Sequence, residues 1–246
     1  VWPRRYGDPT TDRLTPTQGV DRMRAEVGTA LVVRVKFIRT SVRKVSGATD
    51  KPTACRQGHT GPVLILLPPS EKKNATTKPT PAISVYTGVL YQALDWPSLT
   101  MAAKKRGTGS VVIISAKYGA VRPDQLIESY KEKIDNKAMR EPVAKILSAI
   151  KTDLIVDCRS STYKTVWHSP VDKTVEVRVS TVVDGVRTVI THMSKKTRGE
   201  IARWLLQSRS VAKTPEDLYA IVSEKYPCAL TPSDGVEPWV LEVIAI

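Results

Sequence analysis

Short apolar runs that stop abruptly constrain the fold of this chain most. Each run ends in proline, glycine or polar residues, and the three clearest are Val63–Leu67, Val111–Ile114 and Leu154–Val156. Continuous runs of this length are typical of strands buried on both faces of a sheet. The polar residues that follow such strands stand where α/β proteins build ligand sites. The sequence therefore predicts buried strands with a candidate site at their ends.

Apolar residues with helical or alternating spacing fill the rest of the chain after residue 61. The expected helices are Tyr86–Leu94, Pro142–Ile150, Ser160–Trp167, Ser194–Gln207 and Thr214–Lys225. The expected further strands are Val175–Val183, Val186–His192 and Trp239–Ile246. Asp184-Gly185 between the first two of these strands is a strong signal for a β-hairpin. Together these elements predict a mixed α/β fold with a mixed sheet, flanking helices and one hairpin.

The N-terminal quarter differs from the rest in composition. Residues 1–60 hold 12 Lys and Arg against 5 Asp and Glu, whereas residues 61–246 hold 26 against 19. Apart from one strand-like stretch, Ala30–Ile38, this quarter is rich in Pro, Thr and Arg, a composition typical of loose segments. We expect a basic N-terminal extension over residues 1–60 and one domain over residues 61–246. The extension is either a functional basic arm or an upstream segment outside the functional protein.

The net charge and the cysteine pattern indicate which classes of ligand and site are expected in this chain. A net charge of +14 favours binding to a polyanion such as nucleic acid. An excess of charge that serves only solubility would give the same composition. We expect no membrane span, because no apolar run reaches about 18 residues, and with no signal peptide in view we expect a cytoplasmic protein. Three cysteines and three histidines are scattered without metal-ligand spacing. We therefore expect reduced thiols, no cofactor and no metal site, and a dedicated iron site is improbable.

The turn after the second strand is the first candidate site. Ile113–Asp124 passes from the strand into a turn at Gly119, a residue that tolerates positive φ. Lys117, Tyr118 and Arg122 would project from the end of the strand, where a pair of cations with an aromatic ring suits a phosphate and a base or sugar. The other interpretation is a solvated loop with a structural glycine.

The segment after the third strand is the second candidate. Asp157 stands at the strand end, and Ser160 or Ser161 is placed to cap the next helix, whose first N–H groups would form an anion site. Asp157 would act as a general base or would pair with Arg159. Glu71, Glu128 and Tyr130 follow strand ends in the same way, and each carboxylate is as well explained as the partner of a nearby cation.

A basic cluster at the start of a late helix is the third candidate. Lys195, Lys196 and Arg198 are followed by Arg203. Cations near a helix N-terminus oppose the helix dipole, and a bound anion such as a phosphate backbone would offset this cost. A solvated basic face is the other interpretation. His192 precedes the cluster and is more often structural than catalytic in such a setting.

Five blocks in order give the chain a resemblance to the YaaA family of peroxide stress proteins, particularly its actinobacterial-type members. The blocks are LLPPSEKK at 66–73, VYTGVLYQALD at 85–95, SAKYGAVRP at 115–123, LIVDCRSSTY at 154–163 and THMSKKTRGEIARWLL at 191–206. The resemblance covers about residues 62–246. It implies a cytosolic, mixed α/β protein with a YaaA-like fold and a basic cleft, associated with DNA binding, protection of DNA during hydrogen peroxide stress and lower free iron.

The chain also departs from the family pattern. The family has a long helical insert between Ser70 and Val85, where this chain keeps only about a dozen polar residues. The stretch after Tyr130 is also short, and residues 1–60 match nothing in the family. Tyr118, Gly119, Arg122 and Pro123 match the family's turn, and Lys195, Arg198 and Gly199 match its late basic motif. The resemblance attaches no firm catalytic reaction to the chain.

The function that these observations predict is a DNA-binding protein of the peroxide stress response with weak sequence preference. The residues expected to contact DNA are Tyr118, Arg122, Arg159, Tyr163, Lys195, Lys196, Arg198 and Arg203. The alternative is an enzyme acting on a nucleobase, nucleoside or nucleotide in a strand-end pocket. Its catalytic candidates are Asp157, Ser160 and Glu128. The sequence indicates no particular protein partner.

Overall fold

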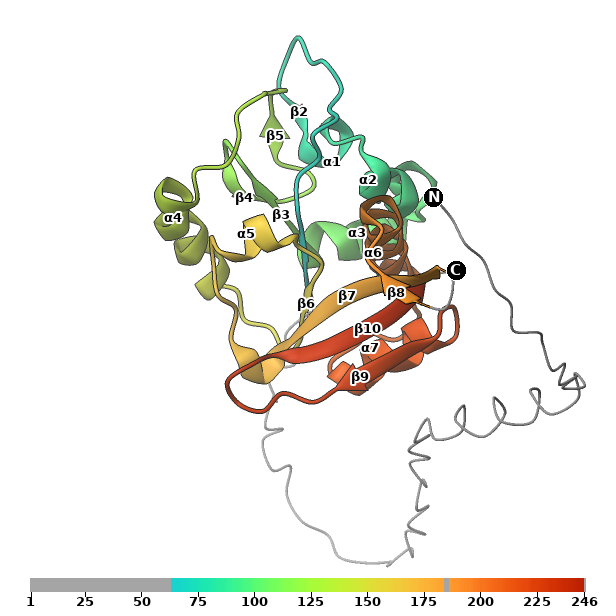
Figure 1. Ribbon diagram of the computed structural model, residues 1–246. Coiled ribbons are helices and arrows are strands. Elements are labelled where there is room, and N and C mark those ends of the chain that lie inside the picture. The colour runs from blue at the N-terminus through green and yellow to red at the C-terminus, as the bar shows by residue number, and fades with distance from the viewer. Residues whose placement is uncertain (1–62, 184–185, 246) are drawn as a thin grey trace, which may run out of the picture. The chain divides into compact units, whose positions relative to one another are not determined.

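The computed structural model describes residues 63–183 and 186–245 (Figure 1). All of these residues belong to one compact unit, Arg56–Ile246. The expected basic extension, its strand-like stretch at 30–38 and the Asp184-Gly185 turn lie outside the described residues.

A mixed sheet organises the domain, as the sequence predicts. Its strand order is β4-β3-β1-β6-β7-β10-β9, with β8 paired to β7. The parallel strands are β3 (Val111–Ser115), β1 (Leu64–Leu67), β6 (Ile155–Asp157), β7 (Thr174–Val183) and β10 (Trp239–Ala245). The antiparallel strands are β4 (Gly119–Val121), β9 (Cys228–Thr231) and β8 (Val186–Thr188). A separate small ladder pairs β2 (Thr80–Pro81) with β5 (Leu126–Ile127).

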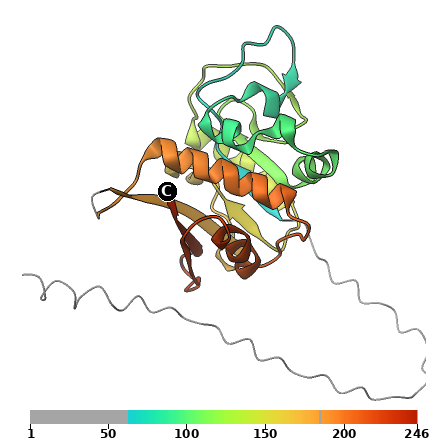
Figure 2. The same cartoon turned by 90° about the vertical axis from the view of Figure 1, so that its right-hand side faces the viewer.

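Helices lie on both faces of this sheet. They are α1 (Ala82–Val85), α2 (Val89–Leu94), α3 (Met101–Ser110), α4 (Asn136–Ser148), α5 (Ser161–Lys164), α6 (Thr191–Gln207) and α7 (Pro215–Ser223). Two 3-10 turns, η1 (Trp96–Ser98) and η2 (Val171–Lys173), connect them. Figure 2 shows α6 running along the sheet from the β7–β8 hairpin.

The two faces of the sheet carry separate cores. The larger core joins Ile65, Leu67 and Val177 to residues of α2, α6 and α7, and we call this side the α6 face. The smaller core joins Leu64 and Leu66 to residues of α4 and of the segment after α5, and we call this side the α4 face. Strand β1 contributes alternate residues to both cores, which explains its unbroken apolar sequence.

The helices on the α4 face cover only part of the sheet. No described residue of β7, β9 or β10 belongs to the smaller core. On β7 the side chains of that face are polar or exposed, as Glu176, Arg178 and Val182 show. We call β3, β1 and β6 the covered half of the sheet, and β7, β10 and β9 the open half.

Most expected elements are confirmed, and four differ. Helix α6 begins at Thr191 rather than at Ser194, so His192 stands in its first turn and not at the end of a strand. Ser194 is buried inside this helix and caps nothing, because packing on the sheet and not a cap sets where the helix starts. Ser160 precedes α5 without a side-chain capping bond, and α5 is a single turn.

The fourth difference concerns Gly107-Thr108-Gly109, which reads as a break before β3 but lies inside α3. A Cβ on Gly107 would stand 2.5 Å from the Trp96 ring. This glycine is therefore present because two segments approach closely, and tertiary packing overrides its weak helix propensity.

Candidate functional site

The candidate site lies at the carboxyl ends of β1, β3 and β6. After β1 the chain passes to α1 and α2, whose residues belong to the α6 face. After β6 it passes to Tyr163 and Trp167, which pack on the α4 face. Neighbouring parallel strands whose connections leave toward opposite faces open a crevice between their ends, and ligands of α/β proteins bind there.

The loop after β1 is fixed to the start of α2. Ser70 Oγ accepts a hydrogen bond of 2.7 Å from the N–H of Gly88 and donates one of 2.6 Å to the carbonyl of Lys72. The Tyr91 hydroxyl donates to the carbonyl of Pro68 at 2.7 Å. A Cβ on Gly88 would lie 2.3 Å from Ser70 Oγ, so only glycine fits there. This network fixes the loop after β1 that carries Glu71 and the two lysines following it.

The Tyr130 hydroxyl ties the end of β3 to α1. Ser115 Oγ donates to it at 2.8 Å, the N–H of Ala116 donates to it at 3.2 Å, and it shares a hydrogen bond of 2.9 Å with the Tyr86 hydroxyl. The rings of Tyr86 and Tyr118 meet the Tyr130 ring edge-on, with centroids 6.4 and 5.7 Å away. Burial raises the pKa of Tyr86 well above its ordinary value, so its hydroxyl stays protonated.

Cations and partly exposed aromatic rings surround this buried centre. Lys73 Nζ lies 4.3 Å from the centroid of the Tyr130 ring, and partial burial lowers the pKa of Lys73. Lys117 Nζ lies 5.6 Å from the Tyr118 ring and forms an exposed ion pair of 3.3 Å with Glu132. Tyr163 is half-buried, and burial followed by the nearby Tyr130 raises its pKa to about 12. Tyr118 thus packs against Tyr130, and Tyr163 lies near enough for Tyr130 to affect its pKa.

The end of β6 holds a buried ion pair. Arg159 Nε and Nη2 donate to the two oxygens of Asp157 at 2.9 and 2.7 Å, and Arg159 Nη1 donates to the carbonyl of Trp167 at 3.0 Å. Asp157 and Arg159 are 2% and 1% exposed. Of the two roles weighed for Asp157, the structure shows the ion pair. Arg159 is buried, and its guanidinium holds the turn after β6 rather than facing solvent.

The basic cluster of α6 divides into structural and exposed side chains. Arg198 donates from Nε and Nη2 to the carbonyl of Val177 at 3.3 and 3.2 Å. Arg203 donates to the carbonyls of Leu94 and Asp95 at 3.0 and 2.8 Å. These two arginines connect α6 to β7 and to the end of α2. Exposed lysines precede them; Lys196 is 3.8 Å from Glu200, and Lys195 is exposed beside it.

The α6 cluster adjoins the end of β6. The charge of Arg198 acts to lower the pKa of the Cys158 thiol, but complete burial has the larger effect and raises that pKa to about 12. Cys158 follows β6 directly, so its thiol is an unreactive core group. Arg198 therefore lies near the end of β6 as well as against β7.

The remaining predicted residues lie at the β3–β5 side. Arg122 is half-buried, donates from Nη1 to the carbonyl of Gly109 at 2.8 Å, and has a pKa lowered by burial. Glu128 is exposed, and its N–H donates to the Tyr118 hydroxyl at 3.3 Å. Gly119 has φ of +70°, as expected for this turn. Asp157 and Ser160 thus belong to the segment between β6 and α5, whereas Glu128 follows β5, and Asp157 is the one of the three that lines either of the two cavities described next.

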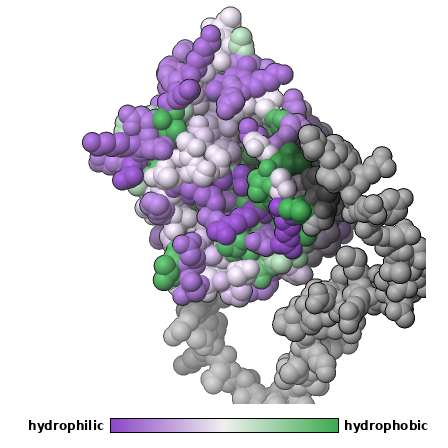
Figure 3. Space-filling model, viewed as in Figure 1, coloured by the Kyte–Doolittle hydropathy of each residue, from purple (hydrophilic) through white to green (hydrophobic). Residues whose placement is uncertain are grey.

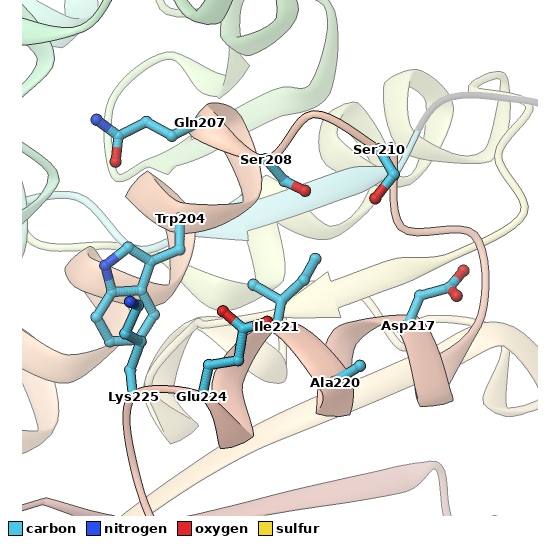
Figure 4. A pocket seen from close by; sticks show the side chains of 9 residues that line it. All are labelled: Trp204, Gln207, Ser208, Ser210, Asp217, Ala220, Ile221, Glu224 and Lys225. Atoms are coloured by element: carbon cyan, nitrogen blue, oxygen red, sulfur yellow. The ribbon is translucent and has the colours of Figure 1, made fainter.

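Two cavities stand out among the described residues. The larger, of about 430 Å³, lies between α6 and α7 and contains none of the predicted site residues (Figure 4). It is lined by Trp204, Gln207, Ser208, Ser210, Asp217, Ala220, Ile221, Glu224 and Lys225. The smaller, of about 270 Å³, has Asp157, Arg159 and Trp167 in its wall. Because Arg159 occupies both oxygens of Asp157, this second cavity offers no free carboxylate from Asp157.

Sequence reasoning missed Lys73 and Tyr86. Lys73 follows the Pro-Pro-Ser-Glu stretch and Tyr86 opens the next block, and cations directly after a strand end were a usable signal at Lys73. Residues 63–183 and 186–245 contain no group of three or more His, Cys, Asp and Glu placed to hold a metal ion. None of the helices in these residues is long and apolar enough to cross a membrane.

Comparison with known proteins places this geometry in a family. Residues 69–230 match the family described as peroxide stress protein YaaA. A UPF0246 protein of Streptomyces coelicolor is 35% identical over 179 residues, which cover 67% of this chain and 68% of the relative. A UPF0246 protein of Corynebacterium glutamicum is 36% identical over 171 residues, covering 63% and 67%. The matched part therefore spans about two thirds of each of these relatives.

Proposed function

The chain belongs to the family of peroxide stress protein YaaA, and from this premise we propose that it binds DNA in the cytoplasm and protects it during peroxide stress. The family name associates the chain with peroxide stress. DNA as the ligand is our inference from the residues at the ends of the parallel strands.

One observation carries the proposal: half-buried tyrosines and exposed cations lie together at one sheet edge. Tyr118 and Tyr163 lie near Tyr130, and Lys73 and Lys117 lie over tyrosine rings. Ring faces suit bases or sugars, and ammonium groups suit phosphates. Because the contacts are aromatic faces and point charges rather than groups that read base edges, sequence preference should be weak.

The structure refines which predicted residues are available to DNA. Lys195 and Lys196 are exposed on α6, and Arg122 is half-buried. Arg159, Arg198 and Arg203 already donate to protein carbonyls or carboxylates. We assign phosphate contacts to Lys73, Lys117, Lys195 and Lys196, and base or sugar contacts to Tyr118 and Tyr163. Arg159, Arg198 and Arg203, which have protein partners, would hold the segments of the site in place without contacting DNA.

Fluorescence anisotropy with labelled DNA across a salt series tests this proposal. For Lys195→Ala/Lys196→Ala we expect weaker binding and a salt slope smaller by about 1 for each phosphate that the variant no longer neutralises. Tyr118→Ala should weaken binding with little change in the slope, because a ring neutralises no phosphate. Arg140→Ala/Lys145→Ala on α4 removes the same charge from another surface and is the matched control. Equal effects of the two double variants would contradict a site at the crevice.

The enzyme alternative receives no comparable support. A general base needs a carboxylate free to accept a proton, and Asp157 is held on both oxygens by Arg159. Incubating the full chain with nucleosides and nucleotides, followed by chromatography, tests this alternative directly. Turnover that Asp157→Asn abolishes would revive it.

A further inference from the structure

The described residues only partly cover the α4 face of the open half, and this face carries charged side chains. On β7 this face carries Glu176, Arg178, Ser180 and Val182, because Val175, Val177 and Val179 point into the core of the other face. On β10 the corresponding residues are Val240, which is buried, and Glu242 and Ile244, which are partly exposed. Figure 3 looks onto this face and shows hydrophilic side chains across its middle with hydrophobic ones beside them.

An uncovered face is unusual for parallel strands. Strands β7 and β10 are parallel over seven paired residues, and parallel sheets are normally covered on both faces. Exposed apolar side chains gather at one end of this face. Val182 is exposed on this face, and Val189 and Ile190 are exposed in the link from β8 to α6. Such a concentration is typical of a surface that a partner covers.

The charges on this face are balanced, in contrast to the chain as a whole. Glu176 pairs with Lys164 at 2.8 Å and with Arg178 at 3.0 Å. Glu242 stands opposite Arg178 in the strand register and pairs with Arg187 at 3.4 Å. Cations and carboxylates therefore alternate along the face, whereas the chain carries a net charge of +14.

We propose that this face, formed by β7, β10 and the β7–β8 hairpin, is the surface on which a second copy of the chain docks. Two copies with the same large positive charge repel each other, and repulsion is least where each surface is locally neutral. A two-fold interface must also be complementary to itself. A locally neutral face meets this requirement, because each Glu is paired with a cation of its own copy and two such faces bring no excess of like charge together.

The charge pattern favours a second copy over other occupants. A nucleic acid would be repelled by Glu176 and Glu242, and their cation partners are already paired. The strands of this face, β7, β8 and β10, cover on the order of 300 Å², from strands about 4.8 Å apart and about 3.3 Å per residue. This is below the ~800 Å² per partner of a standard interface, so we expect a weak, micromolar dimer rather than an obligate one.

Sedimentation equilibrium of the full chain over a wide concentration range tests the proposal. The mass should rise with concentration from 27.1 kDa and saturate at twice that value. A monomer at every concentration overturns the proposal. Growth beyond a dimer without saturation also overturns it, because an isologous interface closes at two copies.

Substitutions at exposed positions locate the interface without disturbing the fold. Val182 and Val189 are 49% and 70% exposed, so Val182→Lys/Val189→Lys should fold normally and weaken dimerisation at least tenfold. Met101→Lys, at an 80% exposed residue of α3, is the matched control and should leave dimerisation unchanged. Val189→Lys alone should have an intermediate effect. A dimer that resists the double variant places the interface elsewhere and overturns the proposal.

Salt separates this inference from the proposed function. Added salt screens the repulsion between two positive copies and should strengthen the dimer, whereas it weakens DNA binding. A dimer that weakens steeply with salt would show that ion pairs between the copies hold it together, and this result would overturn docking through a locally neutral face. DNA binding has its own assay, so either proposal can fail alone.

Discussion

The covered and open halves of the sheet use the same parallel pairing and differ in what lies on their α4 face. In the covered half, β1 is buried at all four residues, and α4 and α5 pack over its neighbours. In the open half, β7 alternates between valines in the core and charged or polar residues outside. Parallel hydrogen bonding between strands is therefore the same whether or not a helix covers them. The sequence of a strand differs, because strands covered on both faces are apolar throughout and strands covered on one face alternate.

This difference separates two kinds of polar interaction. The Asp157–Arg159 pair in the covered half is buried from water, whereas the Glu176–Arg178 pair in the open half has an arginine side chain 52% exposed. Breaking a buried ion pair is costly because the remaining charge is left without a partner and without water. An exposed ion pair contributes little to the free energy of unfolding. Local stability should therefore be high at the candidate site and low on the proposed docking face.

The largest effect should come from breaking the buried pair. Arg159→Ala leaves the Asp157 carboxylate buried without its partner and should lower the free energy of unfolding by about 3–5 kcal/mol. Urea denaturation measures this decrease. Arg178→Ala in the open half is the control and should cost about 0–1 kcal/mol. Similar costs for both variants would remove the distinction between the halves.

Core truncation should give the next largest contrast. Leu66→Ala removes a fully buried side chain from the covered half and should cost about 2–5 kcal/mol in the same assay. Ile244→Ala, on the open face of β10, should cost clearly less in dilute protein. If the loss of unfolding free energy caused by Ile244→Ala grows with protein concentration, while the loss caused by Leu66→Ala does not, then a second copy covers the open face.

Helix α6 spans both halves, and its contact with α2 tests whether they unfold together. A Cβ on Gly199 would lie 2.1 Å from the carbonyl oxygen of Leu90, so Gly199→Ala should cost about 1–3 kcal/mol. Gly109→Ala in α3 meets no atom within 4 Å and should instead stabilise by up to about 1 kcal/mol. Calorimetry should show one transition for both variants. Two separated transitions for Gly199→Ala would mean that the halves are independent units.

The smallest effect is a pH dependence in the open half. Partial burial raises the pKa of Glu176, but hydrogen bonds and charges from Lys164 and Arg178 outweigh it and leave that pKa below its ordinary value. A carboxyl group with a lowered folded pKa stabilises the protein above its unfolded pKa, about 4.3, and this contribution is lost as the pH falls through the folded pKa. Glu176→Gln should remove less than about 1 kcal/mol of acid-sensitive stability. Unchanged acid unfolding would contradict this role.

The sequence predicts the strands well because the order of apolar and polar residues within each strand indicates which of its faces are buried. The unbroken run Val63–Leu67 and the alternation of Val175–Val183 both became strands. Thr214 opens α7 with a complete capping box, as its spacing predicts. Local pattern failed where distant packing decides. Gly107 lies in a helix because it meets Trp96, and α6 starts before Ser194 because its face packs on the sheet.

For the candidate site, the sequence identifies the segments better than the roles. Tyr118 and Tyr163, from two of the strand-end segments that the sequence singles out, both lie near Tyr130. The tertiary structure decides what a guanidinium group contacts. The local sequence therefore did not indicate that Arg159 would be buried, or that Arg203 would donate to the carbonyl of Leu94, 109 positions away. The DNA contacts of the tyrosines and the lysines stay predictions.

Strand β10 stands between β7 and β9, and this position affects how the chain is made. Synthesis delivers β7 long before β10, and until residues 239–245 emerge, β7 exposes a ten-residue edge rich in valine. An unpaired edge of this kind is a template for pairing with other chains. The folding intermediate most prone to aggregate is therefore the one that lacks β10, and ribosome-bound chains stopped before residue 239 should need the most help from chaperones.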